Sequence, residues 1–197
     1  MHTGRLEAFS DGVIAIVITI MVLELRAPNE ATLEALKPVL PTFAAYVMSF
    51  IYIGIYWSNH HHMLQSAKHV NGAVLWANLH LLFWLSLVPF GTKWLGQIGV
   101  QPIPVAIYGL FLLMAAIAYS ILAATLVSVH GRDSSLARAL GADFKGKISI
   151  AIYVLAITLA FWQPVASCVL YVAVAIMWLV PDRRFERLHT GQSAEAE

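Results

Sequence analysis

Polar and ionisable residues inside two otherwise apolar stretches are the candidates for chemistry in this chain. Ser10 and Asp11 interrupt the stretch RLEAFSDGVIAIVITIMVLEL at residues 5–25. A second stretch, YWSNHHHM at residues 56–63, contains consecutive histidines at 60–62. Histidine and carboxylate side chains together are typical of metal binding and of proton relay. One interpretation of this pattern is therefore a membrane metalloenzyme with histidine boxes.

The spacing of the histidines argues against a metal centre. Adjacent residues on a helix point about 100° apart, so three consecutive histidines cannot all bind one metal ion. The single cysteine, Cys168, lies in an apolar segment, and no serine or cysteine lies beside a plausible base in a known motif. We therefore predict no catalytic residue, no metal site, no cofactor and no enzymatic activity. His80 could join the run at 60–62, but the other histidines are dispersed, at His2, His69, His130 and His189.

Composition predicts the elements that position these residues. Hydrophobic residues make up 59% of the 197 residues and charged residues only 12%, and the mean hydropathy is +0.73. A soluble domain is about one-quarter charged, so the chain is predicted to be a membrane protein. A span needs about 20 mostly apolar residues. Six segments meet or approach that length: 6–26, 40–62, 71–93, 103–129, 147–163 and 164–181.

These segments predict an all-α membrane protein with six transmembrane helices per subunit. The six-helix domain is expected at 1–182, and a polar cytoplasmic tail at 183–197. The fifth and sixth segments are short and meet at Gln163 and Pro164, where proline favours the first turn of a new helix. The first segment does not resemble a secretory signal peptide, because acidic and hydroxyl residues interrupt it and no cleavage site of small residues follows.

The distribution of basic residues predicts the orientation in the membrane. Six crossings place both termini on one side. That side carries nine of the twelve Lys and Arg residues, and the other side carries three. By the positive-inside rule, the side with nine is cytoplasmic. Its basic residues are Arg5, Lys68, Arg132, Arg138, Lys145, Lys147, Arg183, Arg184 and Arg187, whereas the opposite side has Arg26, Lys37 and Lys93.

This topology brings polar residues of the first three segments to a similar depth. Ionisable groups inside a bilayer face the protein interior and pair with one another. Asp11 does not share a helix face with Arg5, so the partners of Asp11 are expected on other helices. The candidates are His60, His61 and Asn78.

The apolar part of the first segment carries a stripe along one helix face. Relative to Ile16, a helical wheel places Thr19 at about −60°, Ile20 at about +40° and Leu23 at about −20°. The wheel alone is compatible with a simple packing seam, in which the Thr19 hydroxyl bonds back to the Ala15 carbonyl.

Residues 5–11 carry a family motif. Arg5, Phe9, Ser10 and Asp11 reproduce the RxxxFSD pattern of the prokaryotic relatives of the lysosomal transmembrane potassium channel. GVIAIVITIMVLEL matches the continuation of that first helix, SFIYIGIYWSNHHHM resembles the second helix, and WANLHLLFWLSLVPF resembles the third. The chain is identified by this resemblance as a prokaryotic single-repeat homologue of that family. The similarity is most specific over 5–26 and extends to about residue 93.

The resemblance implies a potassium-preferring cation channel that lacks a TVGYG filter loop, and no such loop occurs in this sequence. It implies a homotetramer in which the first helix of each subunit lines a central pore. Ile16 is then the constriction, Thr19 a ring of hydroxyl groups, and Ile20 and Leu23 further narrow layers. A ring of aliphatic side chains gates by excluding water.

The resemblance also implies the surroundings of the pore helix. A structural polar network is expected to hold that helix at its angle. The implied location is the inner (plasma) membrane of a prokaryote, with both termini cytoplasmic. The implied partners are three further copies of the chain, membrane lipid, and potassium and other monovalent cations, but no nucleic acid. The network residues carried over are Arg5, Phe9, Ser10, Asp11, His60, His61 and Asn78. The pairings expected within this network are Asp11 with His60 or His61, and Ser10 with Asn78.

Proton transport remains an alternative function. Asp11 and the histidines could relay protons, which predicts either a proton-permeable channel or a proton-linked carrier. Carriers usually show internal repeats and helices broken near the midplane. The first segment contains no proline and the chain has no second copy of its opening motif, so proton permeation through the same pore is the better form of this alternative.

Overall fold

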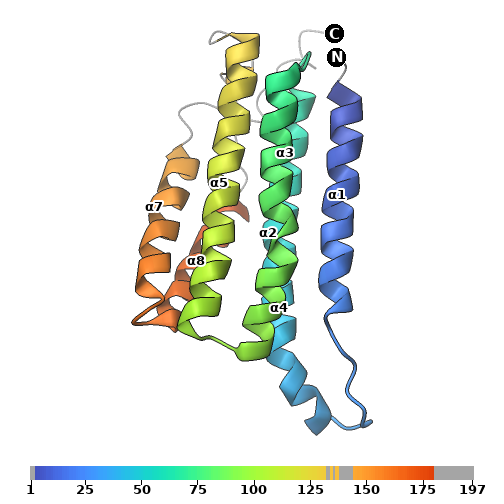
Figure 1. Cartoon of the computed structure of the whole chain (residues 1–197), viewed down its shortest axis with the longest axis vertical. Helices are drawn as coiled ribbons and strands as arrows, with labels where there is room; N and C mark the ends of the chain where they lie inside the picture. Colours follow the sequence, from blue (N-terminus) through green and yellow to red (C-terminus); the bar gives the residue numbers. More distant parts are fainter. Residues whose placement is uncertain (1–2, 132–133, 135, 138–143, 180–197) are drawn as a thin grey trace, which may run out of the picture.

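The chain folds into a bundle of helices (Figure 1). The computed structural model describes residues 3–131, 134, 136–137 and 144–179. Each predicted segment corresponds to one helix or to a consecutive pair, which confirms the all-α membrane fold. The predicted tail at 183–197 and part of the α5–α7 connection lie outside the described residues. The helices are α1 (Thr3–Leu23), η1 (Glu34–Val39), α2 (Leu40–Gln65), α3 (Gly72–Ser86), α4 (Val88–Ile98), α5 (Pro102–His130), α7 (Phe144–Leu159) and α8 (Pro164–Leu179).

The third predicted segment, 71–93, is two helices rather than one. α3 ends at Ser86, and α4 begins at Val88 with Pro89 in its first turn. Proline has no N–H for the helical hydrogen bond and favours a first helical turn, so the helix is interrupted just before it. The two helices together extend over Gly72–Ile98, which is long and apolar enough to cross a membrane.

Four helical segments meet the length and composition of a membrane span: Thr3–Leu23, Glu34–Gln65, Gly72–Ile98 and Pro102–His130. α7 and α8 have 16 residues each. Each is therefore about 24 Å long, which is less than the hydrocarbon thickness of about 30 Å. The two pack against each other and against α5, and Figure 1 shows them as a short pair beside the longer helices.

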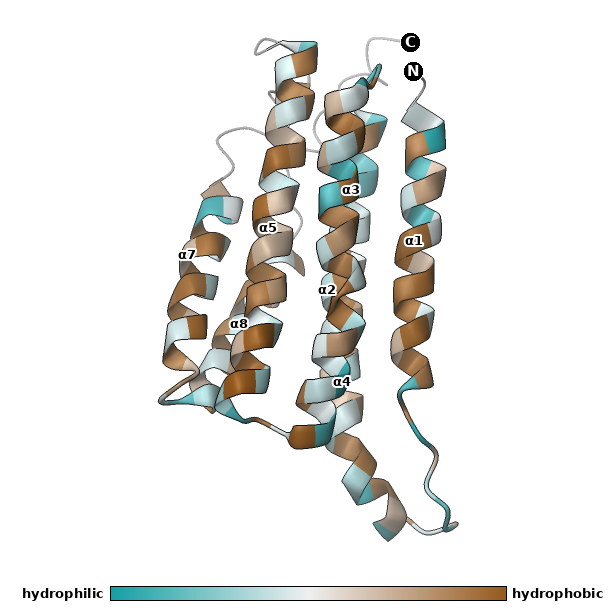
Figure 2. Ribbon diagram, viewed as in Figure 1, coloured by the Kyte–Doolittle hydropathy of each residue, from teal (hydrophilic) through white to brown (hydrophobic). Residues whose placement is uncertain are grey.

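The outer surface of the bundle is apolar. Figure 2 shows hydrophobic residues along the length of the helices and hydrophilic residues concentrated near helix ends and loops. Large side chains such as Trp76, Phe83, Leu155 and Val169 are exposed. A surface of this kind is suited to lipid rather than water. The chain is therefore a multi-pass membrane protein.

Buried hydroxyl groups tie together the helices behind α1. The Ser49 hydroxyl lies 2.6 Å from that of Thr92 and 2.9 Å from that of Tyr108. The Tyr52 hydroxyl donates to the Tyr171 carbonyl at 2.5 Å. These bonds join α2 to α4, α5 and α8 in an interior where an unpaired polar group would be costly. These hydrogen bonds hold together the helices against which α1 packs.

Candidate functional site

α1 has one buried face and one exposed face. It lies at the edge of the bundle and packs against α2, α3 and α4 (Figure 1). Its buried residues are three or four positions apart, so they form one stripe that faces those helices. This stripe consists of Leu6, Ser10, Ile14, Val17 and Met21.

The residues predicted to line a pore lie on the exposed face. Ile16 is 59% exposed, Ile20 45% and Leu23 79%, and Thr19 is exposed as well. Aliphatic side chains that packed against the rest of the subunit would be buried. The structure therefore excludes a packing seam within the subunit, and the stripe faces away from it.

Thr19 supplies the polar atom of this face. Its hydroxyl donates to the Ile16 carbonyl at 2.9 Å, rather than to that of Ala15. Because the hydroxyl hydrogen is used in this bond, Thr19 presents oxygen lone pairs to its surroundings. The face thus combines aliphatic side chains with an oxygen that can accept a hydrogen bond from water or coordinate a cation.

A buried chain of hydrogen bonds joins α1, α2 and α3. Asn78 Nδ2 donates to Ser10 Oγ at 2.9 Å, which is the pairing expected from the sequence, and Ser10 Oγ donates to the Leu6 carbonyl at 2.8 Å. Since the Asn78 amide nitrogen is engaged with Ser10, its Oδ1 faces His60 Nε2, at 2.7 Å. This arrangement assigns the Nε2 proton to His60.

The other nitrogen of His60 has no partner. Nδ1 is the one buried side-chain N or O atom without a hydrogen bond in the part of the chain that the structure describes. His60 is only 1% exposed, so a second proton on Nδ1 would bury an uncompensated charge. The geometry favours His60 as a neutral donor that positions Asn78.

Two further contacts join α1 to α2. Trp57 Nε1 donates to Asp11 Oδ1 at 3.0 Å, and His61 Nδ1 lies 2.8 Å from Glu7 Oε1. The prediction that Asp11 pairs with His60 or His61 is therefore wrong. The two helices are antiparallel, so one turn forward on α2, from Trp57 to His61, matches one turn back on α1, from Asp11 to Glu7.

Sequence reasoning missed Glu7 and Trp57 as parts of this network. A tryptophan near the end of a span is typical of the aromatic belt at the membrane surface, which conceals its role as a donor. Glu7 carried a usable signal, because a carboxylate in an apolar segment is expected to have a partner.

Arg5 and Phe9 were predicted to belong to the network, but the structure does not bring them into it. Both are exposed, and Phe9 is 53% exposed. Arg5 forms no hydrogen bond or ion pair with the described residues. A helical wheel places both within about 20° of Ile16. They therefore extend the exposed face of α1 toward its N-terminal end.

The consecutive histidines point to different partners, as the helical spacing requires. His60 bonds Asn78 inside the bundle, whereas His61 contacts Glu7 at the α1–α2 contact. Among the described residues, no group of three or more His, Cys, Asp or Glu side chains is placed to hold a metal ion.

An ion pair fastens the opposite end of α1. Lys93 Nζ on α4 lies 3.0 and 3.2 Å from the two carboxylate oxygens of Glu24. Both side chains are partly exposed, so the pair contributes at most about 1 kcal/mol. Together with the network at the N-terminal end, it fixes the rotation of α1 at both ends and so fixes which face points outward.

Replacing Asp11 by alanine is expected to reduce the yield and melting temperature of the assembled protein. The change leaves the Trp57 indole N–H without its acceptor, and because this bond is partly exposed we expect a loss of about 1 kcal/mol. Asp11→Asn keeps an acceptor oxygen and is the matched control. Size-exclusion chromatography after heating measures the effect. Normal assembly with altered ion flux would instead place Asp11 in the path of the ions.

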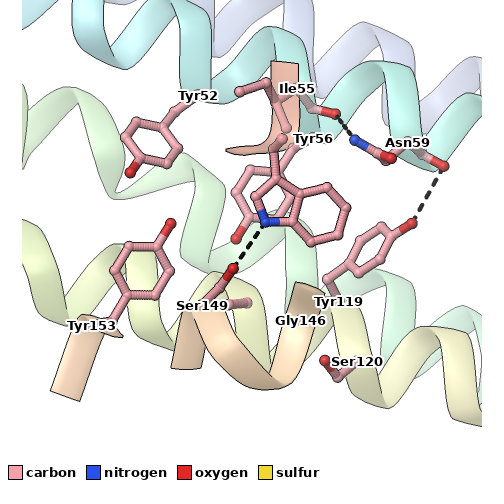
Figure 3. Close-up of a pocket in the computed structure, with 11 residues that line it drawn as sticks. Tyr52, Ile55, Tyr56, Asn59, Tyr119, Ser120, Gly146, Ser149 and Tyr153 are labelled. Atoms are coloured by element: carbon pink, nitrogen blue, oxygen red, sulfur yellow. Dashed lines mark hydrogen bonds between the residues drawn. The ribbon is translucent and has the colours of Figure 1, made fainter. Parts of the chain in front are cut away.

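A separate pocket lies on the side of the subunit away from α1. Its lining residues come from α2, α5, α7 and α8 and include Tyr52, Tyr56, Asn59, Tyr119 and Tyr153 (Figure 3). At the pocket, the Trp178 indole N–H donates to Ser149 Oγ at 2.9 Å. The pocket is not continuous with the exposed face of α1, because α1 contributes none of its lining residues.

Comparison with known proteins shows which family the chain is similar to. Residues 5–89 match the family described as endosomal/lysosomal potassium channel TMEM175. The chain is 54% identical over 187 residues to potassium channel HX13_20290 of Chryseobacterium sp. (strain P1-3), covering 95% of this chain and 97% of that one. It is 36% identical over 129 residues to potassium channel B446_29190 of Streptomyces collinus, covering 61% and 63% of the two chains.

A solved structure shares the fold. The crystal structure of a lysosomal potassium-selective channel TMEM175 homolog from Chamaesiphon minutus superposes on this chain with a TM-score of 0.75. The two are 28% identical, and the match covers 90% of this chain and 96% of the other.

Proposed function

The chain belongs to the TMEM175 family of potassium channels, and on that basis we propose that it is a potassium-preferring cation channel. Ions pass an apolar constriction formed by the α1 helices of four copies of the chain, without a TVGYG filter and without a bound cofactor. The observation that carries this proposal is the exposed face of α1, on which Ile16, Thr19, Ile20 and Leu23 all lie.

The proposed tetramer surrounds the pore with one lining helix from each subunit. One helix per subunit cannot enclose a pore, but four copies related by a closed rotation can. The network of Ser10, Asn78 and His60 and the Glu24–Lys93 ion pair hold the opposite side of α1 to its own subunit. In the proposed tetramer, the remaining face is directed toward the symmetry axis.

Selectivity in such a pore arises from dehydration. Leu23 lies seven positions after Ile16, so the lining layers extend over about 10.5 Å of the axis. An ion that passes rings of aliphatic side chains must shed or deform its hydration shell. Potassium is hydrated more weakly than sodium and is penalised less. The Thr19 oxygens replace part of the lost hydration, which gives a preference for potassium rather than the sharp discrimination of a carbonyl filter.

The proposed location is the inner (plasma) membrane of a prokaryote, with lipid against the apolar outer surface. The N-terminal end of α1 and the α2–α3 loop are at the same end of the bundle in Figure 1, and the excess of Lys and Arg on that side supports a cytoplasmic orientation.

Ion flux into proteoliposomes tests the proposal. The purified full-length protein is reconstituted under a potassium gradient, and the measurement is repeated with sodium and with a proton gradient alone. We expect potassium flux to exceed sodium flux. Proton flux without potassium flux would favour the proton-transport alternative, and no flux of either cation from a verified tetramer would contradict the channel proposal.

A further inference from the structure

The loop between α2 and α3 is held by the last residue of α5. The backbone N–H of Lys68 donates to His130 Nε2 at 3.0 Å, and that of His69 donates to the same atom at 3.4 Å. One imidazole nitrogen thus accepts two hydrogen bonds from a loop about sixty residues earlier in the chain. We call this arrangement the His130 latch.

The partners of the ring define its protonation state. His130 Nδ1 lies 2.9 Å from the Leu126 carbonyl, which can only accept, so Nδ1 carries the hydrogen. Nε2 faces two N–H donors and must present its lone pair. The latch therefore requires the neutral Nδ1–H tautomer. A second proton on Nε2 would turn the acceptor into a donor and remove both bonds to the loop.

Among the described residues, α3, α5, α7 and the α2–α3 loop carry no Asp or Glu. α5 itself and α3 contain no Asp, Glu, Lys or Arg. The described ionisable residues at the end of α2, in the α2–α3 loop and at the start of α7 are histidines and lysines. The His69 ring lies with its centroid 4.5 Å from that of His130. The groups concerned are His62 at the end of α2, Lys68 and His69 in the loop, and Lys145 and Lys147 at the start of α7.

The loop that the latch holds connects the two helices that position α1. α2 contacts α1 through Trp57 and His61, and α3 contacts it through Asn78. The loop thus joins the two helices that set the rotation of the proposed pore helix. Histidine is the side chain whose charge ordinarily changes between about pH 5 and 8.

We propose that the His130 latch is a pH-operated regulator of this channel. Neutral His130 holds the α2–α3 loop. Acid on the side of the α2–α3 loop protonates Nε2, releases the loop and changes the probability that the pore is open. The coupling to the pore rests on the function proposed above, whereas the latch itself does not.

Hydrogen exchange of the backbone amides at residues 66–71 tests the latch directly. The full-length protein in lipid nanodiscs is compared at pH 8 and pH 5.5, with exchange corrected for its intrinsic pH dependence. We expect the protection of Lys68 and His69 to fall by about tenfold at the lower pH. His130→Gln keeps an acceptor that does not titrate and should remove this pH dependence. His130→Lys should lack protection at both values. Unchanged protection in the unaltered protein would overturn the latch.

Potassium currents from excised proteoliposome patches test the coupling. With pH varied on the α2–α3 loop side, the unaltered protein should show a pH-dependent open probability that His130→Gln removes. His80→Gln, a histidine change on α3 outside the latch, should keep it. If hydrogen exchange shows that the loop is released at low pH but the open probability does not change with pH, the proposed regulation is overturned. Absence of current at every pH would instead contradict the channel proposal, while the exchange result still decides the latch.

Discussion

Replacing Ile16 by asparagine is expected to raise potassium flux and to flatten the preference of the channel for potassium over sodium. The amide offers hydrogen bonds to water in a ring that otherwise excludes it, so ions retain more of their hydration shell at the constriction. Lowering the barrier by about 1.4 kcal/mol increases the rate about tenfold. Flux of each cation into proteoliposomes, normalised to the amount of tetramer, gives both quantities.

Because Ile16 is exposed in the subunit, its replacement should change the pore without destabilising the fold. The side chain is 59% exposed in the subunit, so its replacement leaves no cavity in the core. Ile176 on α8 is 56% exposed and lies on a helix outside the contacts of α1, which makes Ile176→Asn the matched control. The control should leave flux and preference unchanged. An Ile16→Asn tetramer with unaltered flux would remove Ile16 from the pore.

Replacing Asn78 by alanine is expected to produce the largest loss of stability of any single change in the polar network. Asn78 is fully buried and bridges Ser10 and His60. Hydrogen bonds between helices in membranes contribute only about 0.6 kcal/mol on average. The greater cost is the His60 Nε2–H left without an acceptor, because both ring nitrogens are then unpaired in the interior, and this adds about 1–3 kcal/mol.

Thermal unfolding of the purified protein, followed by loss of the tetramer, measures this effect. Asn59→Ala is the matched control, because Asn59 is half-buried and its amide donates only to the Ile55 carbonyl of its own helix. A double-mutant cycle with His60→Ala should show a coupling of about 0.5–3 kcal/mol. Equal melting temperatures for Asn78→Ala and Asn59→Ala would show that the buried chain of hydrogen bonds does not hold α1 in place.

The break between α3 and α4 shows how an apolar run conceals local structure. Hydropathy treats 71–93 as continuous, because a span is recognised by its composition. Pro89 was the local signal for a second helix, since a proline favours the first turn of a helix. The short lengths of α7 and α8 were evident from the sequence, as was the turn before Pro164.

Only some of the hydrogen-bond partners of the α1 residues could be predicted from the spacing of residues in the sequence. The Ser10–Asn78 pair was predictable, because counting helices and depths brings both residues to one level. The partner of Asp11 was not, because Trp57 and His61 lie one turn apart on the same face of α2 and differ mainly in depth, by about 6 Å. The register of α1 along α2 decides between them, and it is set by packing along both helices. Asp11 is level with Trp57, and Glu7 is level with His61.

The sequence by itself determined that the chain is a helical membrane protein, where its apolar segments lie, and which family motif begins the first one. These properties depend on composition and on order along the chain. Only the tertiary structure decided which face of α1 is buried, and that Arg5 and Phe9 lie with Ile16 on the exposed face. That choice depends on contacts among α1, α2, α3 and α4. A single helix has the same wheel whichever side its neighbours occupy.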